Sequence, residues 1–306
     1  MSFSPTDAAF EGFRLVRRNP MVLLAWTLLY LVVGVATLLT MTSMFPALAE
    51  LSAAAEAFRG TDPESLDDFM PILSAYGRMF SGMGWVMVLS ILTNVMLTTA
   101  VSRSVLADHA HDVFGHVRLG MDEVRVFVVT LVLSILMGLI AFAVVIVAAI
   151  IGGIAVAAID GWGWIISLVL LLGSVAFVIW LAVRWSLAIP ITVAEKKMAF
   201  FDSFGVTKGR FWPMLGMMLL ALVMAMLVGL LSMLVSMPIS LMSGAEMISR
   251  ASSDPSVMMA AYRIDNAWMW ASTVVNAIIS ALIFGILYAP FAAAYRDLTG
   301  RGVTSD

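Results

Sequence analysis

The run VFVVTLVLSILMGLIAFAVVIVAAII, from Val126 to Ile151, carries no charge and consists mostly of Val, Leu, Ile and Ala. A helix needs about 20 mainly apolar residues to cross the hydrocarbon core of a bilayer, so this run is long enough to span a membrane. Hydrophobic residues make up 62% of the 306 positions, charged residues make up 12%, and the mean hydropathy is +1.02. Because a soluble domain is about half apolar and about a quarter charged, the sequence predicts a membrane protein.

Six apolar segments meet the same length requirement. They are Met21–Phe45, Met83–Val101, Val126–Ile151, Trp162–Val183, Pro213–Met237 and Trp268–Pro290. We therefore predict an all-α fold, a polytopic bundle of six transmembrane helices in one integral membrane domain over residues 1–306. The third and fifth uncharged runs are longer than one crossing, and we expect them to break or leave the membrane at Gly152-Gly153 and at Pro238. A re-entrant segment is the alternative at either place.

Basic residues are concentrated on one side of the membrane that these segments are predicted to cross. If the N-terminus lies inside the cell, thirteen of the seventeen Lys and Arg residues fall on the inner side. Because Lys and Arg are concentrated in cytoplasmic segments, we predict a protein of the inner (cytoplasmic) membrane with both termini in the cytoplasm. Tryptophans at the predicted boundaries, with Trp185 and Trp212 on the inner side, indicate an aromatic belt at the membrane surface.

A charged phrase occurs twice, each time just before an apolar segment. It is FEGFRLVRRNP at Phe10–Pro20 and FFDSFGVTKGRFWP at Phe200–Pro213, with a weaker version at Met121–Phe127. The returning helices, which run back to the side of the N-terminus, also echo each other, with LAIPITVA at Leu187–Ala194 and LYAPFAAA at Leu287–Ala294. We therefore expect three degenerate helical hairpins, each introduced by a short amphipathic helix on the cytoplasmic side.

These phrases bring aromatic rings and basic groups together at a predicted membrane surface. An amphipathic helix of this kind lies in the interface, and each juxtamembrane Lys or Arg adds about 1 kcal/mol of attraction to anionic headgroups. The candidate contacts to lipid headgroups, or to a membrane or cytoplasmic protein partner, are Lys196, Lys197, Phe204, Lys208, Arg210, Phe211, Trp212, Arg14, Arg17 and Arg18. The simpler alternative is a positive-inside anchor that only sets the topology.

The loop after the fourth segment carries a denser pattern. It consists of RWSLAIP at Arg184–Pro190, then Glu195, Ser203 and TKGRFW at Thr207–Trp212. This pattern resembles the glycerophosphoryl diester phosphodiesterase membrane-domain family and related uncharacterised bacterial multi-span proteins. The chain departs from it at Asp202 and Val206, where the family often has Arg and Leu. The resemblance implies a multi-span module near lipid metabolism; the 306 residues contain no phosphodiesterase domain, so we expect no hydrolase activity.

Polar groups inside the apolar segments are few. Asn94 and Asn276 are the most conspicuous, and we expect them to form interhelical hydrogen bonds; a polar path through a transporter or lipid-translocating permease is the alternative. Arg184 and Glu195 could pair across the turn that ends the fourth segment. One predicted loop holds all three histidines together with two aspartates: Asp108, His109, His111, Asp112 and His116. The spacing suits a metal ion, but a hydrated loop surface explains it more simply, so we predict no metal site.

Composition and motifs also exclude several classes of function. The chain has no Cys, which excludes disulfides, thiolate metal sites and cysteine nucleophiles. A net charge of −3 without a basic tail gives no reason to expect a nucleic-acid partner. The sequence contains no nucleophile elbow, Walker A, dinucleotide-binding or zincin motif. We therefore expect a non-enzymatic protein without a cofactor, which docks lipid headgroups or a protein partner through its cytoplasmic loops.

Overall fold

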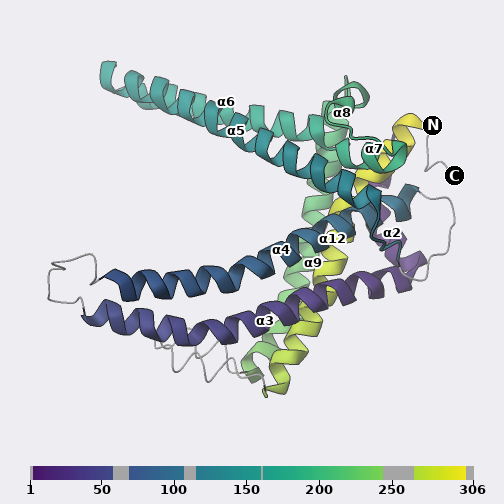
Figure 1. Cartoon of the computed structure of the whole chain (residues 1–306). Coiled ribbons are helices and arrows are strands. Elements are labelled where there is room, and N and C mark those ends of the chain that lie inside the picture. The colour runs from purple at the N-terminus through teal and green to yellow at the C-terminus, as the bar shows by residue number, and fades with distance from the viewer. Residues whose placement is uncertain (1–2, 58–68, 107–114, 160, 244–264, 301–306) are drawn as a thin grey trace. The chain divides into compact units, whose positions relative to one another are not determined.

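The structure is a computed structural model, and it describes residues 3–57, 69–106, 115–159, 161–243 and 265–300. Every regular element in these ranges is helical, which confirms the predicted all-α class (Figure 1). The helices are α1 (Pro5–Ala9), α2 (Glu11–Arg18), α3 (Pro20–Ala57), α4 (Met70–Leu106), α5 (Met121–Ala158), α6 (Gly163–Trp185), α7 (Ala188–Glu195), α8 (Asp202–Val206), α9 (Phe211–Ser243) and α12 (Ala267–Thr299).

Six of these helices, α3, α4, α5, α6, α9 and α12, are long and apolar enough to cross a membrane. They contain the predicted segments, except that α6 begins at Gly163 rather than at Trp162, and they confirm a multi-pass helical membrane protein. Most of them are longer than predicted, because the backbone hydrogen bonds continue past the apolar run. α4, for example, begins at Met70, whereas the predicted segment begins at Met83.

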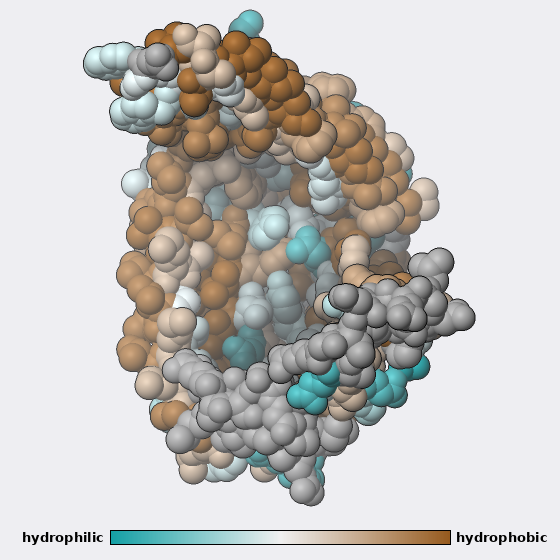
Figure 2. Space-filling view, turned by 90° about the vertical axis from the view of Figure 1, so that its left-hand side faces the viewer, coloured by the Kyte–Doolittle hydropathy of each residue, from teal (hydrophilic) through white to brown (hydrophobic). Residues whose placement is uncertain are grey.

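The long helices expose apolar side chains over much of their surface, as Figure 2 shows for one face of the molecule. Leu139, Phe142 and Ile154 on α5 are largely exposed, as are Leu172 and Val175 on α6. A helix satisfies its own backbone hydrogen bonds, so an apolar exterior of this kind is stable in hydrocarbon and unfavourable in water.

The chain divides into two compact units, which are described separately. Unit 1 contains Met1–Arg18, Val95–Val223 and Gly285–Asp306, and unit 2 contains Asn19–Asn94 and Met224–Phe284. In unit 2, Trp26 of α3 is fully buried, and the Tyr30 and Phe284 rings pack edge to face with centroids 6.1 Å apart. Arg78 of α4 forms an exposed ion pair with Glu50 of α3.

In unit 1, α5 and α6 form a hairpin whose two helices lie side by side (Figure 1). α5 continues through Gly152 and Gly153 to Ala158, so the predicted break at this glycine pair is wrong. A Cβ on Gly152 would lie 2.9 Å from Ser167 Oγ of α6, and that hydroxyl donates a 3.0 Å hydrogen bond to the Gly152 carbonyl. The glycine therefore serves close helix packing rather than helix termination.

The predicted break at Pro238 is also wrong. α9 runs from Phe211 to Ser243 with Pro238 inside it. A proline removes one backbone donor, but the remaining hydrogen bonds and local adjustment can hold an apolar membrane helix together. α12 likewise contains Pro290.

The three leading segments, at the starts of α3, α5 and α9, differ from the predicted repeat in two respects. The phrases at Phe10–Pro20 and Phe200–Pro213 form the short helices α2 and α8. The third phrase, Met121–Phe127, is the first part of α5 itself, so the prediction of a separate introducing helix there is wrong. α8 has only five residues, so the second phrase is a compact turn rather than an extended interfacial helix.

The turn between α5 and α6 provides a test of this packing. A Cβ on Gly163 would overlap the backbone of Ala155 and Val156, which cannot move aside as a side chain can. We expect Gly163→Ala to lower the free energy of unfolding by about 1–3 kcal/mol, measured by thermal or denaturant unfolding in detergent. The matched control is Gly138→Ala on α5, where a Cβ meets nothing within 4 Å. Equal stability of the two variants would contradict the close approach of the two helices.

Candidate functional site

One end of unit 1 gathers its polar side chains around three arginines. Arg103, Arg184 and Arg296 lie near the ends of the three returning helices α4, α6 and α12. Each arginine reaches a leading segment of a long helix, and for α12 this is the segment at the start of the chain. In all three contacts the end of a returning helix meets a leading segment, but the group that the arginine contacts differs.

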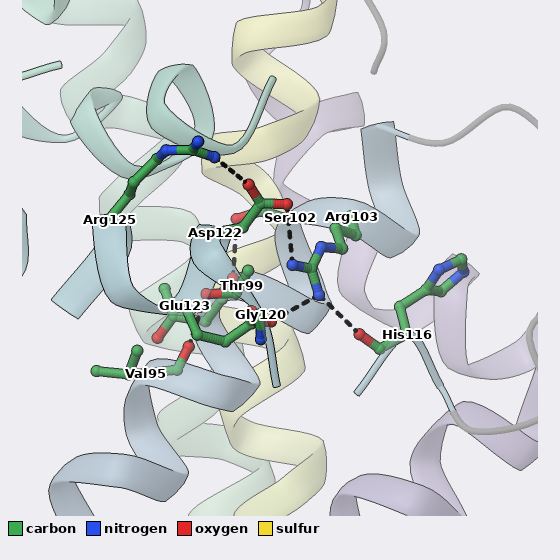
Figure 3. A network of polar contacts seen from close by, with 10 residues as sticks. Val95, Thr99, Ser102, Arg103, His116, Gly120, Asp122, Glu123 and Arg125 are labelled. Carbon is green, nitrogen blue, oxygen red and sulfur yellow. Dashed lines mark hydrogen bonds and ion pairs between the residues drawn. The ribbon is translucent and has the colours of Figure 1, made fainter. Parts of the chain in front are cut away.

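The Arg103 contact is a buried ion-pair network (Figure 3). Its guanidinium lies 2.6 Å from Glu123 Oε1 and 3.0 Å from Asp122 Oδ2, and it donates to the His116 carbonyl at 3.3 Å. The side chains of Arg103 and Glu123 are only 14% and 6% exposed. Glu123 Oε2 also accepts the backbone N–H of Gly120 at 2.8 Å, which fixes the carboxylate at the first turn of α5.

The Arg296 contact joins the two terminal regions of the chain. Its guanidinium lies 3.6 Å from Glu11 of α2 and donates a 3.0 Å hydrogen bond to the Val105 carbonyl at the end of α4. Glu11 is 7% exposed. A Cβ on the next residue, Gly12, would lie 2.6 Å from the Gly285 carbonyl oxygen of α12, so α2 packs on α12 without a side chain between them.

Arg184 differs from the other two arginines because it has no carboxylate partner among the described residues. Its Nη1 donates weakly to the Phe204 carbonyl at 3.5 Å and to Thr207 Oγ1 at 3.4 Å, and its guanidinium stacks over the Trp180 ring. Its Nε is buried without a hydrogen-bond partner in the described part of the chain. Asp202, which stands in the acid position of this phrase, instead lies 3.6 Å from Lys197.

Ser203 holds the leading segment of α9 against the end of α6. Its hydroxyl donates a 2.6 Å hydrogen bond to the Arg184 carbonyl and accepts the Leu187 N–H at 3.2 Å. Ser203 and Gly12 occupy the same place in the repeated phrase. Ser203 bonds to Arg184 and Leu187, and Gly12 packs against Gly285 and Ile286, just before Leu287 in the repeated returning helix. The repeated sequences therefore correspond to repeated contacts. The copies differ in the chain between α6 and α7, which breaks at Ser186–Leu187, while α12 continues.

The described residues of unit 1 include more basic than acidic side chains. They include twelve Lys and Arg residues and seven Asp and Glu residues, and each of these seven acids forms an ion pair. The basic residues without an ion pair or other charged partner among the described residues include Arg17, Arg18, Arg184, Lys208 and Arg210. All but Arg184 are exposed. We call Arg17, Arg18, Lys208 and Arg210 the basic face.

The predicted headgroup contacts do not all belong to this face. Lys196 and Lys197 are exposed, and the Lys197 ammonium lies 2.8 Å from Glu195, whose hydrogen bond raises the pKa of Lys197. Arg14 is half-buried and donates a 2.7 Å hydrogen bond to Asp7, which lowers the pKa of that carboxyl.

The predicted aromatic contacts also differ in exposure. Trp212 is 76% exposed, whereas Phe211 is half-buried. Phe204 is half-buried between Trp180 and Trp185, with ring centroids 6.3 and 5.9 Å away. Trp212 is therefore the predicted ring that is best placed to enter a surrounding membrane.

Three further sequence predictions have structural outcomes. Arg184 does not pair with Glu195, which instead binds Lys197 and accepts a 3.1 Å hydrogen bond from Tyr295. Asn94 and Asn276 are both exposed, and their role as intramembrane polar contacts stays a prediction. Most of the Asp/His cluster, Asp108, His109, His111 and Asp112, lies outside the described residues. Within the described ranges, no three potential metal ligands come together; His116 contributes its carbonyl to Arg103.

A cavity of about 670 Å³ lies among the helices of unit 1. Its wall is formed by α4, α5, the α6–α7 turn, α9 and α12, and it has no charged side chain or histidine. Most of the wall is apolar, with hydroxyls from Thr98, Ser102, Thr130, Ser134, Ser186 and Tyr288. Trp185 forms part of this wall, although its place at a predicted helix boundary had indicated an interfacial anchor. It is 7% exposed, and its buried Nε1–H has no hydrogen-bond partner among the described residues.

Comparison with known proteins gives a family but no described function. Comparisons with curated proteins and with solved structures each gave no match. The resemblance to the glycerophosphoryl diester phosphodiesterase membrane-domain family therefore stays a prediction. The model of one family, a domain of unknown function (DUF7847), matches residues 8–298, which include all three arginine contacts and the six long helices except the last residue of α12. The chain therefore belongs to the DUF7847 family.

Proposed function

We propose that the protein is a non-enzymatic integral protein of a bacterial inner membrane that docks anionic lipid headgroups at its basic face. The observation that carries this proposal is the ion-pair pattern of unit 1. Its described acids are all used in internal ion pairs, while Lys208, Arg210, Arg17 and Arg18 remain exposed and unneutralised. Lipid phosphates are the anions that a membrane supplies next to such a face.

Exposed aromatic side chains close in sequence to Lys208 and Arg210 support a position at the membrane surface. Trp212 lies two positions after Arg210 and is 76% exposed, and Phe201, seven positions before Lys208, is 62% exposed. Rings of this kind favour the headgroup level, because one side of the residue meets hydrocarbon and the other meets water. The proposed role of the rings is to anchor the basic groups at the depth of the phosphates.

Arg184 is a further candidate ligand for a lipid phosphate. An arginine whose acceptors are a carbonyl and a hydroxyl at 3.4–3.5 Å has room to form stronger, charge-assisted hydrogen bonds to a phosphate. The equivalent arginines Arg103 and Arg296 are already bound to Glu123 and Glu11. Arg184 is therefore the arginine of the three that we propose as a phosphate ligand.

The charge distribution between the units supports the proposed orientation. The described part of unit 2 has one basic residue, Arg78, and three acids, Glu50, Glu56 and Asp265, whereas the described part of unit 1 has twelve basic residues and seven acids. Positive charge marks the cytoplasmic side of membrane proteins, and that leaflet carries most anionic lipid. The contact of Glu11 with Arg296 supports placing both terminal regions on this side.

Replacing Lys208 and Arg210 together by Ser tests the proposal. Each basic group near an anionic surface contributes about 1 kcal/mol, so the double variant should lose about 30-fold of its affinity for phosphatidylglycerol. The measurement is native mass spectrometry of the purified protein in detergent, titrated with phosphatidylglycerol and with phosphatidylcholine. The wild-type preference for phosphatidylglycerol should also weaken as salt rises, because exposed charges are screened.

The control is Arg78→Ser in unit 2, which removes one exposed arginine that is paired with Glu50. It should leave the phosphatidylglycerol preference unchanged. If the wild type binds the two lipids equally, or if the double variant keeps the wild-type preference, headgroup docking at this face is wrong. Co-purification of a protein partner that depends on Lys208 and Arg210, without a lipid preference, would point to protein docking instead.

A transporter or lipid-translocating permease is the second candidate, and the cavity of about 670 Å³ is the observation that favours it. Translocation requires more than binding, since the lipid must cross between leaflets. Reconstituted vesicles with fluorescent lipid in one leaflet separate the two functions. Protein-dependent exchange between leaflets would favour the permease, and binding without exchange would favour docking alone.

A further inference from the structure

The cavity of unit 1 has an uncharged wall that carries two hydroxyls without a hydrogen bond. We propose that this cavity binds a lipid-soluble quinone, whose two carbonyl oxygens accept hydrogen bonds from Thr130 and Ser134 of α5. The site goes beyond headgroup docking, because its ligand needs no phosphate and no contact with the basic face.

Thr130 and Ser134 differ from the other hydroxyl residues of unit 1. A serine or threonine in a helix commonly donates to the carbonyl three or four positions before it. Thr99, Ser102 and Ser174 do so at 2.7–2.8 Å. Among the described Ser and Thr residues of unit 1, Thr130 and Ser134 are the two whose hydroxyls form no hydrogen bond, and both line the cavity. Both hydroxyls are therefore free to donate to a ligand.

The spacing of these hydroxyls indicates where the acceptors of the ligand lie. Thr130 and Ser134 are four positions apart on one face of α5, which places their Cβ atoms about 5–6 Å from each other. A 1,4-quinone has two carbonyl oxygens on opposite edges of one flat ring, at a separation close to one turn of a helix. Its carbonyls can only accept, so each hydroxyl donates to one of them.

The rest of the wall indicates a flat, uncharged ligand. It contains no Asp, Glu, Lys, Arg or His, so a charged group inside it would lose its hydration without gaining a partner. Tyr288 and Phe291, three positions apart on one face of α12, bring aromatic rings to the same cavity, and a planar ring can stack on such side chains. The volume of about 670 Å³ lies in the usual range of ligand cavities, about 300–1,000 Å³.

The α5 edge of the cavity indicates that the ligand comes from the hydrocarbon of a membrane. Ser134 and Gly138 are exposed although both line the cavity, so the cavity is open at this edge. Leu131, Ile135 and Leu139, which lie close by on α5, are exposed apolar side chains suited to contact with hydrocarbon. A quinone with an apolar tail dissolves in hydrocarbon and can enter from this side.

The probe is decylubiquinone, a 1,4-benzoquinone with a decyl tail, compared with decylbenzene, which keeps a ring and the tail but lacks the carbonyls. Binding to the purified full-length protein in detergent is measured by isothermal titration calorimetry. We expect the wild type to bind the quinone about 10- to 100-fold more tightly than decylbenzene, which corresponds to two hydrogen bonds. Equal affinity for the two compounds would overturn the proposal.

Variants of the two hydroxyl residues test the proposed contacts. Thr130→Val and Ser134→Ala each remove a hydroxyl that bonds to nothing within the chain, so the fold should be kept. Each change should weaken quinone binding about 3- to 10-fold and leave decylbenzene binding unchanged. Thr99→Val is the matched control, because the Thr99 hydroxyl bonds within α4 and Thr99 is not part of the wall. A double variant of Thr130 and Ser134 that binds the quinone as tightly as the wild type would also overturn the proposal.

Two further comparisons separate this site from lipid binding. 1,2-Dioctanoylglycerol is uncharged and has two ester carbonyls but no ring. If this lipid, and not the quinone, loses affinity in the double variant, the cavity binds a lipid ester and the quinone proposal is wrong. The Lys208→Ser/Arg210→Ser variant should keep quinone binding, and the double variant of Thr130 and Ser134 should keep the salt-sensitive preference for phosphatidylglycerol. A failure at one site is therefore distinguishable from a failure at the other.

Discussion

Replacing Arg103 with Met should lower the free energy of unfolding by about 3–5 kcal/mol. The change leaves the carboxylates of Asp122 and Glu123 at the start of α5 without their common partner, and the Glu123 side chain is only 6% exposed. An uncompensated buried charge is much less favourable than the ion pair it came from. Thermal or denaturant unfolding of the purified protein in detergent measures the loss.

Two comparisons separate this effect from a general loss of charge. Arg78→Met removes an arginine from an ion pair in which both side chains are more than half exposed, so it should cost about 0–1 kcal/mol. Adding Glu123→Gln to Arg103→Met should restore part of the lost stability, because the buried charge is removed with its partner. Equal losses for Arg103→Met and Arg78→Met would contradict a buried network at the start of α5.

Ser203→Val should be the second strongly destabilising change, with a loss of about 2–5 kcal/mol. Ser203 is fully buried, and its hydroxyl satisfies both the Arg184 carbonyl and the Leu187 N–H at the break between α6 and α7. Each of these buried backbone groups would lose its side-chain partner at a cost of about 1–3 kcal/mol. Unfolding in detergent again gives the measurement.

The conservative variant Ser203→Thr keeps the hydroxyl and should retain most of the stability. Ser81→Val on α4 is the matched control, because the Ser81 hydroxyl is exposed and bonds only within its own helix. A Ser203→Val variant as stable as Ser81→Val would show that this serine does not hold the leading segment of α9 in place.

The six long helices could be predicted because each apolar run is long enough to cross a membrane. Their internal breaks were predicted wrongly for a physical reason. Gly152-Gly153 and Pro238 are helix-breaking residues in water, but the first allows α6 to approach and the second costs only local backbone hydrogen bonding in an otherwise complete helix. Sequence alone does not distinguish a glycine that ends a helix from one that admits a neighbour.

The basic residues of the site could be found from sequence, but their partners could not. The repeated phrases located Glu11 and Arg210, and the aromatic-basic pattern located Lys208 and Trp212. The contacts of Arg103 with Glu123 and of Arg296 with Glu11 depend on how helices pack, as does the isolation of Arg184. One available signal was overlooked: an arginine stands near the end of every returning helix, and an acid stands in every leading segment.

The surroundings of Trp185 could not be predicted from the sequence either. Its sequence position at a helix boundary is typical of an interfacial anchor, and Trp212 has the exposure that such a role requires. Trp185 instead lies in the wall of a cavity that residues from several helices form. A single helix cannot show which of its faces such a cavity will adjoin.

Headgroup docking in the living membrane is tested most directly by photo-crosslinking at position 212. Trp212 follows the basic residue Arg210, and Trp162, between α5 and α6, is similarly exposed and serves as the comparison position. A photoreactive amino acid replaces each in turn, and mass spectrometry identifies the crosslinked species from intact cells. We predict anionic phospholipid at position 212, enriched above the level at position 162. The same lipid composition at both positions, or a protein adduct at position 212, would contradict the proposed function.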